Sequence, residues 1–199
     1  MNQILFWTAV GFALGALPFS YWLGRASLHT DIRRSGDGNP GAANAWRAGS
    51  WRVGLPAVLL DWGKGALPVA VAHYGLGIRG WALLPIALAP VVGHAFTPFL
   101  RGRGGKAVAT TFGIWTGLTL WEAPTVLGLS VGLVRLVQGV DGWTVMLGMA
   151  ALLAYLLVRG ITGPLLAVWV GNLILLAWKH RSELRGGPRR RQRAGASHD

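Results

Sequence analysis

The chain of 199 residues contains no cysteine, which excludes disulfides, thiol nucleophiles and thiolate metal ligands. Charged residues are also scarce, at 13%, and only 7 acidic side chains stand against 19 lysines and arginines. Hydrophobic residues, in contrast, make up 52% of the chain, and the mean hydropathy is +0.44. Because an ordinary soluble domain of this size is less apolar, the composition predicts an integral membrane protein.

Apolar stretches recur along the chain at lengths near the ~20 residues that a membrane-spanning helix needs. We therefore predict an all-α integral membrane protein with about seven transmembrane helices. The expected spans are residues 2–24, 53–77, 80–100, 107–121, 123–134, 143–158 and 161–178. The connection between the fourth and fifth spans stays open, since Glu122 and Pro124 fit either a tight hairpin or a kink in one long helix.

The remaining polar residues suggest one membrane domain and one tail. We expect residues 1–184 to form a single polytopic membrane domain, and the basic residues 185–199 to form a disordered cytoplasmic tail. With seven spans, all Lys and Arg residues except Lys64, Arg79 and Arg159 fall on one side. Cytoplasmic loops are enriched in such cations, so we place the N-terminus outside and the C-terminus in the cytoplasm.

The net charge of +12 then forms a rim at the cytoplasmic surface of the membrane. Anionic lipid headgroups and anionic metabolites are the partners that suit such a rim. We accordingly expect membrane lipids as partners and no nucleic acid.

The segment 101–106, RGRGGK, stands immediately before an expected span. It is not a nucleotide-binding P-loop, because the positions that should hold glycine and a hydroxyl residue hold Leu100 and Ala107. Gly104, Gly105 and Lys106 nevertheless precede a helix N-terminus, where free N–H groups attract anions. This loop is therefore a candidate phosphate site, with an ordinary flexible cytoplasmic turn as the alternative.

A second glycine-rich segment, residues 31–49, contains the pattern G-x-G-x-x-G over 36–41. No strand precedes it and no βαβ unit surrounds it, so a dinucleotide site is excluded. Asn39 and Asn44 supply amide donors, and Arg47 supplies a guanidinium fork that suits phosphate. A plain glycine and asparagine turn followed by a cytoplasmic arginine explains the segment equally well.

Two histidines and one charged pair complete the candidate groups. His94 lies near the inner end of the third span, and His180 opens the basic tail, where Glu183 follows at helical spacing. Apart from Glu183, neither histidine has a metal-binding neighbour at that spacing, so we predict no metal and no cofactor. Asp61 and Lys64, three residues apart on one helix face, are expected to form an ion pair within a span.

Four stretches together carry a family resemblance: GDGNPGAANAWRAG, LLDWGKGALP, GHAFTPFLRGRGGKAVAT and KHRSEL. In this order and spacing the chain resembles the acyl-phosphate:glycerol-3-phosphate acyltransferases of the PlsY type. The resemblance implies a multi-pass protein of the bacterial inner membrane whose active site faces the cytoplasm. It also implies acyl transfer from a fatty acyl phosphate to the 1-hydroxyl of glycerol 3-phosphate, the first step of phospholipid synthesis, with lysophosphatidate and phosphate as products.

The resemblance also implies roles for individual residues. Lys106 and Arg47 would bind phosphate, and His180 would orient a substrate or its hydroxyl. The matched substrate-binding positions are Gly38, Asn39, Gly41, Asn44, Arg47, His94, Arg103, Gly104, Gly105 and Lys106.

Several positions depart from the family pattern. Asp37 stands where the family has serine, Glu183 where asparagine is usual, Arg103 in place of lysine and Ala107 in place of glycine. We expect His180, Lys106, Asp37 and Glu183 to be the catalytic residues, with Asp37 or Glu183 as general base toward the glycerol hydroxyl.

Other functions stay open on the sequence alone. The two additional carboxylates also fit a relative with a changed substrate, or an inactive paralogue that only binds lipid phosphates. The intramembrane residues Asp61 and Lys64, with many glycines and prolines in the spans, also fit a small transporter.

Overall fold

The structure is a computed structural model that describes residues 1–191, and its secondary structure consists of helices and one isolated β-bridge. Within these residues, four stretches are long and apolar enough to cross a membrane: Asn2–Leu28, Ala42–Gly75, Gly80–Leu100 and Asp141–Val158. A shorter apolar helix spans Pro164–Lys179. These features agree with the predicted all-α membrane protein.

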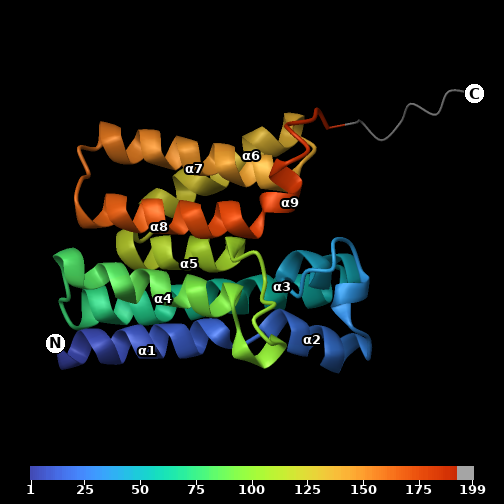
Figure 1. Ribbon diagram of the computed structural model, residues 1–199, viewed down its shortest axis with the longest axis horizontal. Coiled ribbons are helices and arrows are strands. Elements are labelled where there is room, and N and C mark those ends of the chain that lie inside the picture. Colours follow the sequence, from blue (N-terminus) through green and yellow to red (C-terminus); the bar gives the residue numbers. More distant parts are fainter. Residues whose placement is uncertain (192–199) are drawn as a thin grey trace, which may run out of the picture.

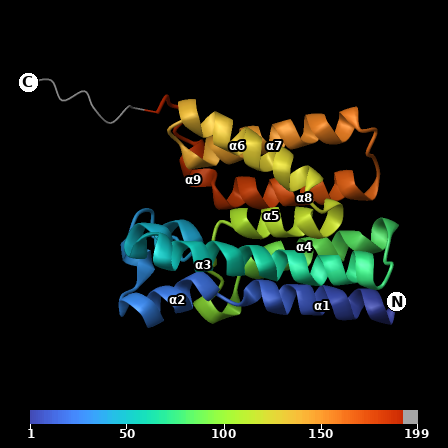
Figure 2. The same cartoon turned by 180° about the vertical axis from the view of Figure 1, so that it is seen from behind.

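The long helices run lengthwise through the molecule in alternating directions, so the loops collect at two ends (Figures 1 and 2). The helices are α1 (Asn2–Ala16), α2 (Phe19–Leu28), α3 (Ala42–Ala70), α4 (Leu83–Ala95), α5 (Val108–Thr119), α6 (Glu122–Val137), α7 (Asp141–Val158), α8 (Pro164–Lys179) and α9 (Arg181–Leu184). Shorter turns are η1 (Ile32–Arg34), η2 (Val71–Gly75), η3 (Gly80–Ala82) and η4 (Pro98–Leu100).

The first expected span, residues 2–24, is divided into two helices. Leu17 has φ −64 and ψ 118, the extended conformation that a following proline favours, and Pro18 begins the turn into α2. The carbonyl of Leu17 therefore leaves the helical ladder and accepts a hydrogen bond from Lys64, at 2.7 Å. This break delivers a free backbone acceptor to the charged pair inside the bundle.

The helix expected from residue 53 begins earlier, at Ala42. Gly49 and Ser50 depart from helical geometry, with φ −125 and +56, so residues 42–48 form a separate helical segment ahead of the kink. Hydropathy alone does not detect this segment, because it is short and Asn44 and Arg47 interrupt its alanines. As a result Asn44 and Arg47 lie on a helix rather than in a loop.

The fourth and fifth expected spans form a hairpin. The α5 helix ends at Thr119, Leu120 adopts a positive φ of 54, and α6 starts at Glu122 and runs back along the bundle (Figure 2). The hairpin, rather than one kinked helix, is the arrangement that the structure adopts.

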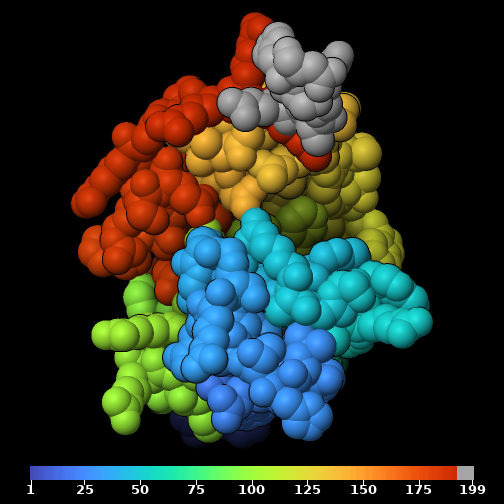
Figure 3. All heavy atoms as spheres, turned by 90° about the vertical axis from the view of Figure 1, so that its right-hand side faces the viewer, coloured from blue at the N-terminus to red at the C-terminus, as the bar shows by residue number. Residues whose placement is uncertain are grey.

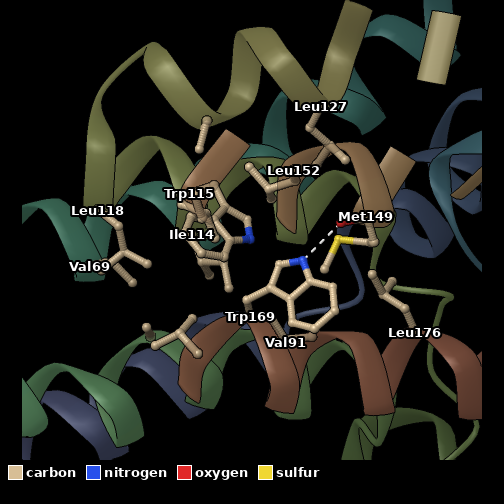
Figure 4. Close-up of a cluster of buried hydrophobic side chains, with 14 of the residues drawn as sticks. Val69, Val91, Ile114, Trp115, Leu118, Leu127, Met149, Leu152, Trp169 and Leu176 are labelled. Atoms are coloured by element: carbon tan, nitrogen blue, oxygen red, sulfur yellow. Dashed lines mark hydrogen bonds between the residues drawn. The ribbon is translucent and has the colours of Figure 1, made fainter. Parts of the chain in front are cut away.

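The main core lies between α4, α5, α6, α7 and α8, with Val69 of α3 at its edge, and contains two buried tryptophans (Figure 4). The indole of Trp169 donates to the Met149 carbonyl at 2.9 Å, and that of Trp115 donates to Asn172 Oδ1 at 3.2 Å. Buried indole N–H groups normally need such partners. The packing fixes α5 and α8 against each other, and these two helices carry the site described next.

The basic tail begins in contact with the bundle. The Gly139 amide donates to the Arg189 carbonyl at 2.8 Å, the Arg191 amide donates to the Val137 carbonyl at 2.8 Å, and Gln138 and Arg190 form the β-bridge. Residues 189–191 therefore lie beside the turn between α6 and α7. Residues 192–199 of the predicted tail lie outside the described residues.

Candidate active site

The segments singled out from the sequence meet at one end of the bundle. Figure 3 looks onto this end, where the stretch from α2 to the start of α3, the loop before α5, the turn before α7 and the residues after α8 form one continuous face. The prediction that these segments share one end agrees with the structure. Arg79 and Arg159 lie at the opposite end, before η3 and after α7.

Lys106 is the centre of the site. Its ammonium group forms close ion pairs with Asp37 Oδ2 and with Glu183 Oε1. The second carboxylate oxygen of Glu183 lies 3.0 Å from His180 Nδ1. One lysine therefore joins the glycine-rich segment before α3, the loop before α5 and the short helix α9.

These contacts shift the pKa values of the three charged groups. Burial raises the pKa of Glu183, but hydrogen bonds from His180 and Lys106 outweigh this effect and lower it to about 2. Burial also opposes ionisation of Asp37, yet Lys106 keeps the pKa of its carboxyl below the usual value. Burial lowers the pKa of Lys106, and the two carboxylates more than compensate, so that it is raised. All three groups are ionised at neutral pH, and Glu183 on its own is a weak base.

The segment before α3 holds Asp37 in a network of hydrogen bonds. Asn44 Nδ2 donates to Asp37 Oδ1 at 2.9 Å and to the Asn39 carbonyl at 2.8 Å, and Arg47 donates to Asn44 Oδ1 at 2.8 Å. Gly36 closes the turn with φ +58, and a Cβ there would lie 2.4 Å from Asn44 Oδ1. Only glycine fits this position, so the turn sets the direction of Asp37.

Arg47 lies at the rim of the site, with 45% of its side chain exposed. Its guanidinium is 3.5 Å from Asp141 Oδ2, and Arg135 approaches the other oxygen of that carboxylate at 2.9 Å. Gly38 has φ +77 in the exposed turn, and Gly41 caps the start of α3. The amide oxygen of Asn39 is buried and has no hydrogen-bond partner in the described residues.

The glycine pair before Lys106 packs on His94. A Cβ on Gly104 would lie 1.9 Å from the His94 carbonyl, and a Cβ on Gly105 would lie 2.1 Å from His94 Nε2. His94 is buried and its Nδ1 is 3.7 Å from Asp61 Oδ1. Its position beneath the glycine pair supports the loop from below. Arg103 is exposed, and its side chain makes no ion pair within residues 1–191.

Asp61 and Lys64 form the ion pair expected from their spacing. Their charged atoms are 2.8 Å apart and both side chains are 2% exposed. Ser20 Oγ donates to Asp61 Oδ2 at 2.5 Å, and Thr110 Oγ1 donates to the Asp61 carbonyl at 3.0 Å. With the Leu17 carbonyl accepting from Lys64, this pair joins α1, α2, α3 and α5 just below the site.

Sequence reasoning missed Lys179, which lies at the end of α8. Its Nζ donates to the Ala95 carbonyl and to the Gly104 carbonyl, each at 2.9 Å. A lysine next to His180 at the end of an apolar span was the available signal. In the described part of the chain, no group of three or more His, Asp or Glu side chains could hold a metal ion.

The arrangement can be compared with known proteins. A family model described as glycerol-3-phosphate acyltransferase matches residues 5–186. The chain belongs to this acyltransferase family. A glycerol-3-phosphate acyltransferase of Thermotoga maritima is 39% identical over 194 residues, covering 90% of this chain and 95% of the relative. One from Thermus thermophilus is 36% identical over 186 residues, covering 90% and 89%.

Solved structures of the acyltransferase family have the same fold. The crystal structure of PlsY (YgiH), an integral membrane glycerol 3-phosphate acyltransferase in its glycerol 3-phosphate form, aligns with a TM-score of 0.85 and 26% identity. The alignment covers 96% of each chain. The lysophosphatidic acid form aligns with a TM-score of 0.83. The predicted family, the enzyme class and the multi-pass membrane fold are confirmed.

Proposed function

We propose that this chain transfers the acyl group of a fatty acyl phosphate to the 1-hydroxyl of glycerol 3-phosphate, with lysophosphatidate and inorganic phosphate as products. The observation that carries the proposal is the convergence of Asp37, Lys106, His180 and Glu183 from three separate segments onto one end of the bundle. An acyl phosphate is already activated. Its transfer requires cations for two phosphate groups and an acceptor for the hydroxyl proton. Lys106 in the cluster and Arg47 at its rim are the candidate cations, and His180 is the candidate acceptor.

The membrane arrangement follows from the same end of the molecule. We propose that α1, α3, α4, α5, α6, α7 and α8 all cross the bacterial inner membrane, with the N-terminus outside. The site end would then face the cytoplasm, since the loops rich in lysine and arginine lie there. Glycerol 3-phosphate would arrive from water, and the acyl chain of the donor would stay in the lipid.

Lys106 and Arg47 would bind phosphate oxygens by exchanging their present carboxylate partners for the substrates. Lys106 has 18% of its side chain exposed, so water and a small anion can reach it. The α5 helix starts at Val108, two residues after Lys106, and its first N–H groups lack partners within the helix. Cations and amides at this position would stabilise the negative charge that grows on the departing phosphate.

We assign the proton of the glycerol hydroxyl to His180, because its ring carries an acceptor nitrogen with no partner in residues 1–191. When Nδ1 donates to Glu183, the lone pair of the ring lies on Nε2, which is buried and has no partner in the described residues. Glu183 would orient the ring and stabilise its charged form. The role expected for Glu183 as base thus passes to its neighbour, because a carboxyl with a pKa of about 2 binds a proton weakly.

The direct test is an assay of purified protein with palmitoyl phosphate and glycerol 3-phosphate. We expect lysophosphatidate and inorganic phosphate in equal amounts, and no product when palmitoyl-coenzyme A replaces palmitoyl phosphate. The Thermotoga maritima relative is a suitable positive control. The absence of product under conditions in which that relative turns over would overturn the proposal and favour a role in binding lipid phosphates.

A further inference from the structure

The three lysines of the chain, Lys64, Lys106 and Lys179, are all buried or half-buried. Lys64 and Lys106 each have a carboxylate partner. Lys179 has no carboxylate within ion-pair distance in residues 1–191, and its hydrogen bonds go to two backbone carbonyls. A buried ammonium group needs hydrogen-bonding partners, and hydrogen bonds from a charged donor are strong. The two bonds of Lys179 therefore hold both carbonyls in place.

The two carbonyls belong to places that must stay together. Ala95 is the last residue of α4, and Gly104 begins the glycine pair that leads to Lys106. The loop between them leaves α4 and returns to pack on His94, where the approach is too close for any Cβ. Lys179 therefore holds the two ends of this loop, at Ala95 and Gly104, close together.

The same end of α8 also holds the other half of the site. His180 follows Lys179 directly, and Glu183 lies one turn further along. Lys179 thus ties the loop that carries Lys106 to the helix end that carries the partners of Lys106. The ammonium group also lies 5.5 Å from the centre of the Phe96 ring, which holds its stem against the start of the loop.

We infer that Lys179 is a positioning residue that fixes the Lys106 loop against α8 and α9, so that Lys106 meets phosphate in its binding geometry. The inference deepens the proposed function and rests on it. Without the two hydrogen bonds the loop would populate other positions, and only the fraction in the bound geometry would take substrate. Substrate affinity would fall, while the chemical step in the bound complex would stay close to normal.

The test compares Lys179→Met, Lys179→Arg and Arg181→Met. Methionine keeps the unbranched stem and removes the donors. Arg181→Met is the matched control. It also removes one positive charge, two residues further along the chain, but the Arg181 side chain is exposed and its one hydrogen bond within residues 1–191 goes to the Trp178 carbonyl. We expect Lys179→Met to raise KM for glycerol 3-phosphate about 10-fold or more, with kcat changed by less than about 3-fold. Lys179→Arg should restore part of the loss, and Arg181→Met should leave KM within about 2-fold.

A second measurement does not depend on activity. Hydrogen exchange of the peptide covering residues 96–107 should become faster in Lys179→Met and stay unchanged in Arg181→Met. If the wild type made no lysophosphatidate but exchange still became faster in Lys179→Met, the proposed function would be overturned. The positioning role of Lys179 would be retained. Wild-type KM together with unchanged exchange in Lys179→Met would overturn the inference, and so would an equal rise in KM in Arg181→Met.

Discussion

Lys64 and Lys106 both pair with carboxylates at the same end of the bundle, but their surroundings differ. Lys64 has one carboxylate partner and a backbone carbonyl, and its side chain is 2% exposed. Lys106 has two carboxylate partners and is 18% exposed, and the carboxylate of Asp37 is 36% exposed. The first pair lies inside the bundle among α2, α3, α4 and α5, whereas the second lies at the surface between two loops and α9.

From this difference we predict a structural role for the pair of Asp61 with Lys64 and a functional role for Lys106. Removing one partner of a fully buried pair leaves a buried charge without compensation, so the first pair should matter mainly for stability. A lysine in a partly exposed pair can exchange its carboxylate partner for a phosphate at a small cost in free energy. Water reaches the lysine whether it is paired with the carboxylate or with the phosphate. The two clusters touch through His94 and Gly105, which places the rigid pair directly beneath the exchangeable one.

The largest effect should come from breaking the closed pair with Asp61→Asn. This change leaves the Lys64 charge buried and without a carboxylate, which typically costs about 3–5 kcal/mol. The matched control is Asp31→Asn, which breaks an exposed pair with Arg33 and should cost less than about 1 kcal/mol. Unfolding of both variants in detergent by a chemical denaturant measures the comparison. Equal stability of the two variants would show that burial does not distinguish these pairs.

Lys106→Ala, unlike Asp61→Asn, should impair turnover much more than stability. Turnover of palmitoyl phosphate and glycerol 3-phosphate should fall about 10²–10³-fold, as expected when a group that stabilises charge in the transition state is removed. Stability should change by less than about 1 kcal/mol, since the two remaining carboxylates are reached by water. Lys106→Arg serves as the control that retains the charge. Wild-type turnover in the alanine variant would remove Lys106 from the mechanism.

Gly105→Ala tests the contact between the two clusters. The added methyl would lie 2.1 Å from His94 Nε2, so either the histidine or the Lys106 loop must move. Overpacking of this kind costs about 1–3 kcal/mol. Gly63→Ala is the control, because a Cβ at that helical position meets nothing within 4 Å and should be neutral or slightly stabilising. Thermal unfolding and the activity assay together show whether Gly105→Ala lowers stability alone or also lowers turnover by displacing Lys106.

Local features of the sequence predicted the parts of this comparison that depend on short-range spacing. The ion pair of Asp61 with Lys64 follows from one helical turn, and the helix start just after Lys106 follows from the change from glycine to apolar residues. Long-range partners did not follow in this way. Nothing in the spacing shows that Asp37 and Glu183 meet at one lysine, because that meeting depends on how α3, α5 and α8 pack.

Backbone detail was equally hidden from the sequence. Hydropathy treats residues 42–48 as a polar loop, although they form helix ahead of the kink at Gly49 and Ser50. The division of the first span at Pro18 was visible as a proline within an apolar run, but its consequence was not. The freed Leu17 carbonyl becomes a ligand of Lys64 only in three dimensions.

The smallest expected effect concerns the two carboxylates that pair with Lys106. Asp37 and Glu183 compete with phosphate for Lys106, so replacing Asp37 with serine should lower KM for glycerol 3-phosphate about 5–10-fold. Asp31→Ser is the matched control, since it removes a carboxylate that pairs with Arg33 and not with Lys106, and its KM should stay within about 2-fold.

Glu183→Asn should behave differently from Asp37→Ser, because Glu183 also orients His180 through its second oxygen. KM should again fall, but kcat should fall with it by about 10-fold or more, as the imidazole loses the carboxylate that holds its tautomer. The two variants together test whether both carboxylates compete with phosphate for Lys106. They also test whether Glu183 alone takes part in proton transfer, through His180. A higher KM in Asp37→Ser would show that this carboxylate assists binding. Unchanged kcat in Glu183→Asn would show that Glu183 does not assist His180. The departing phosphate would then be the candidate acceptor of the hydroxyl proton.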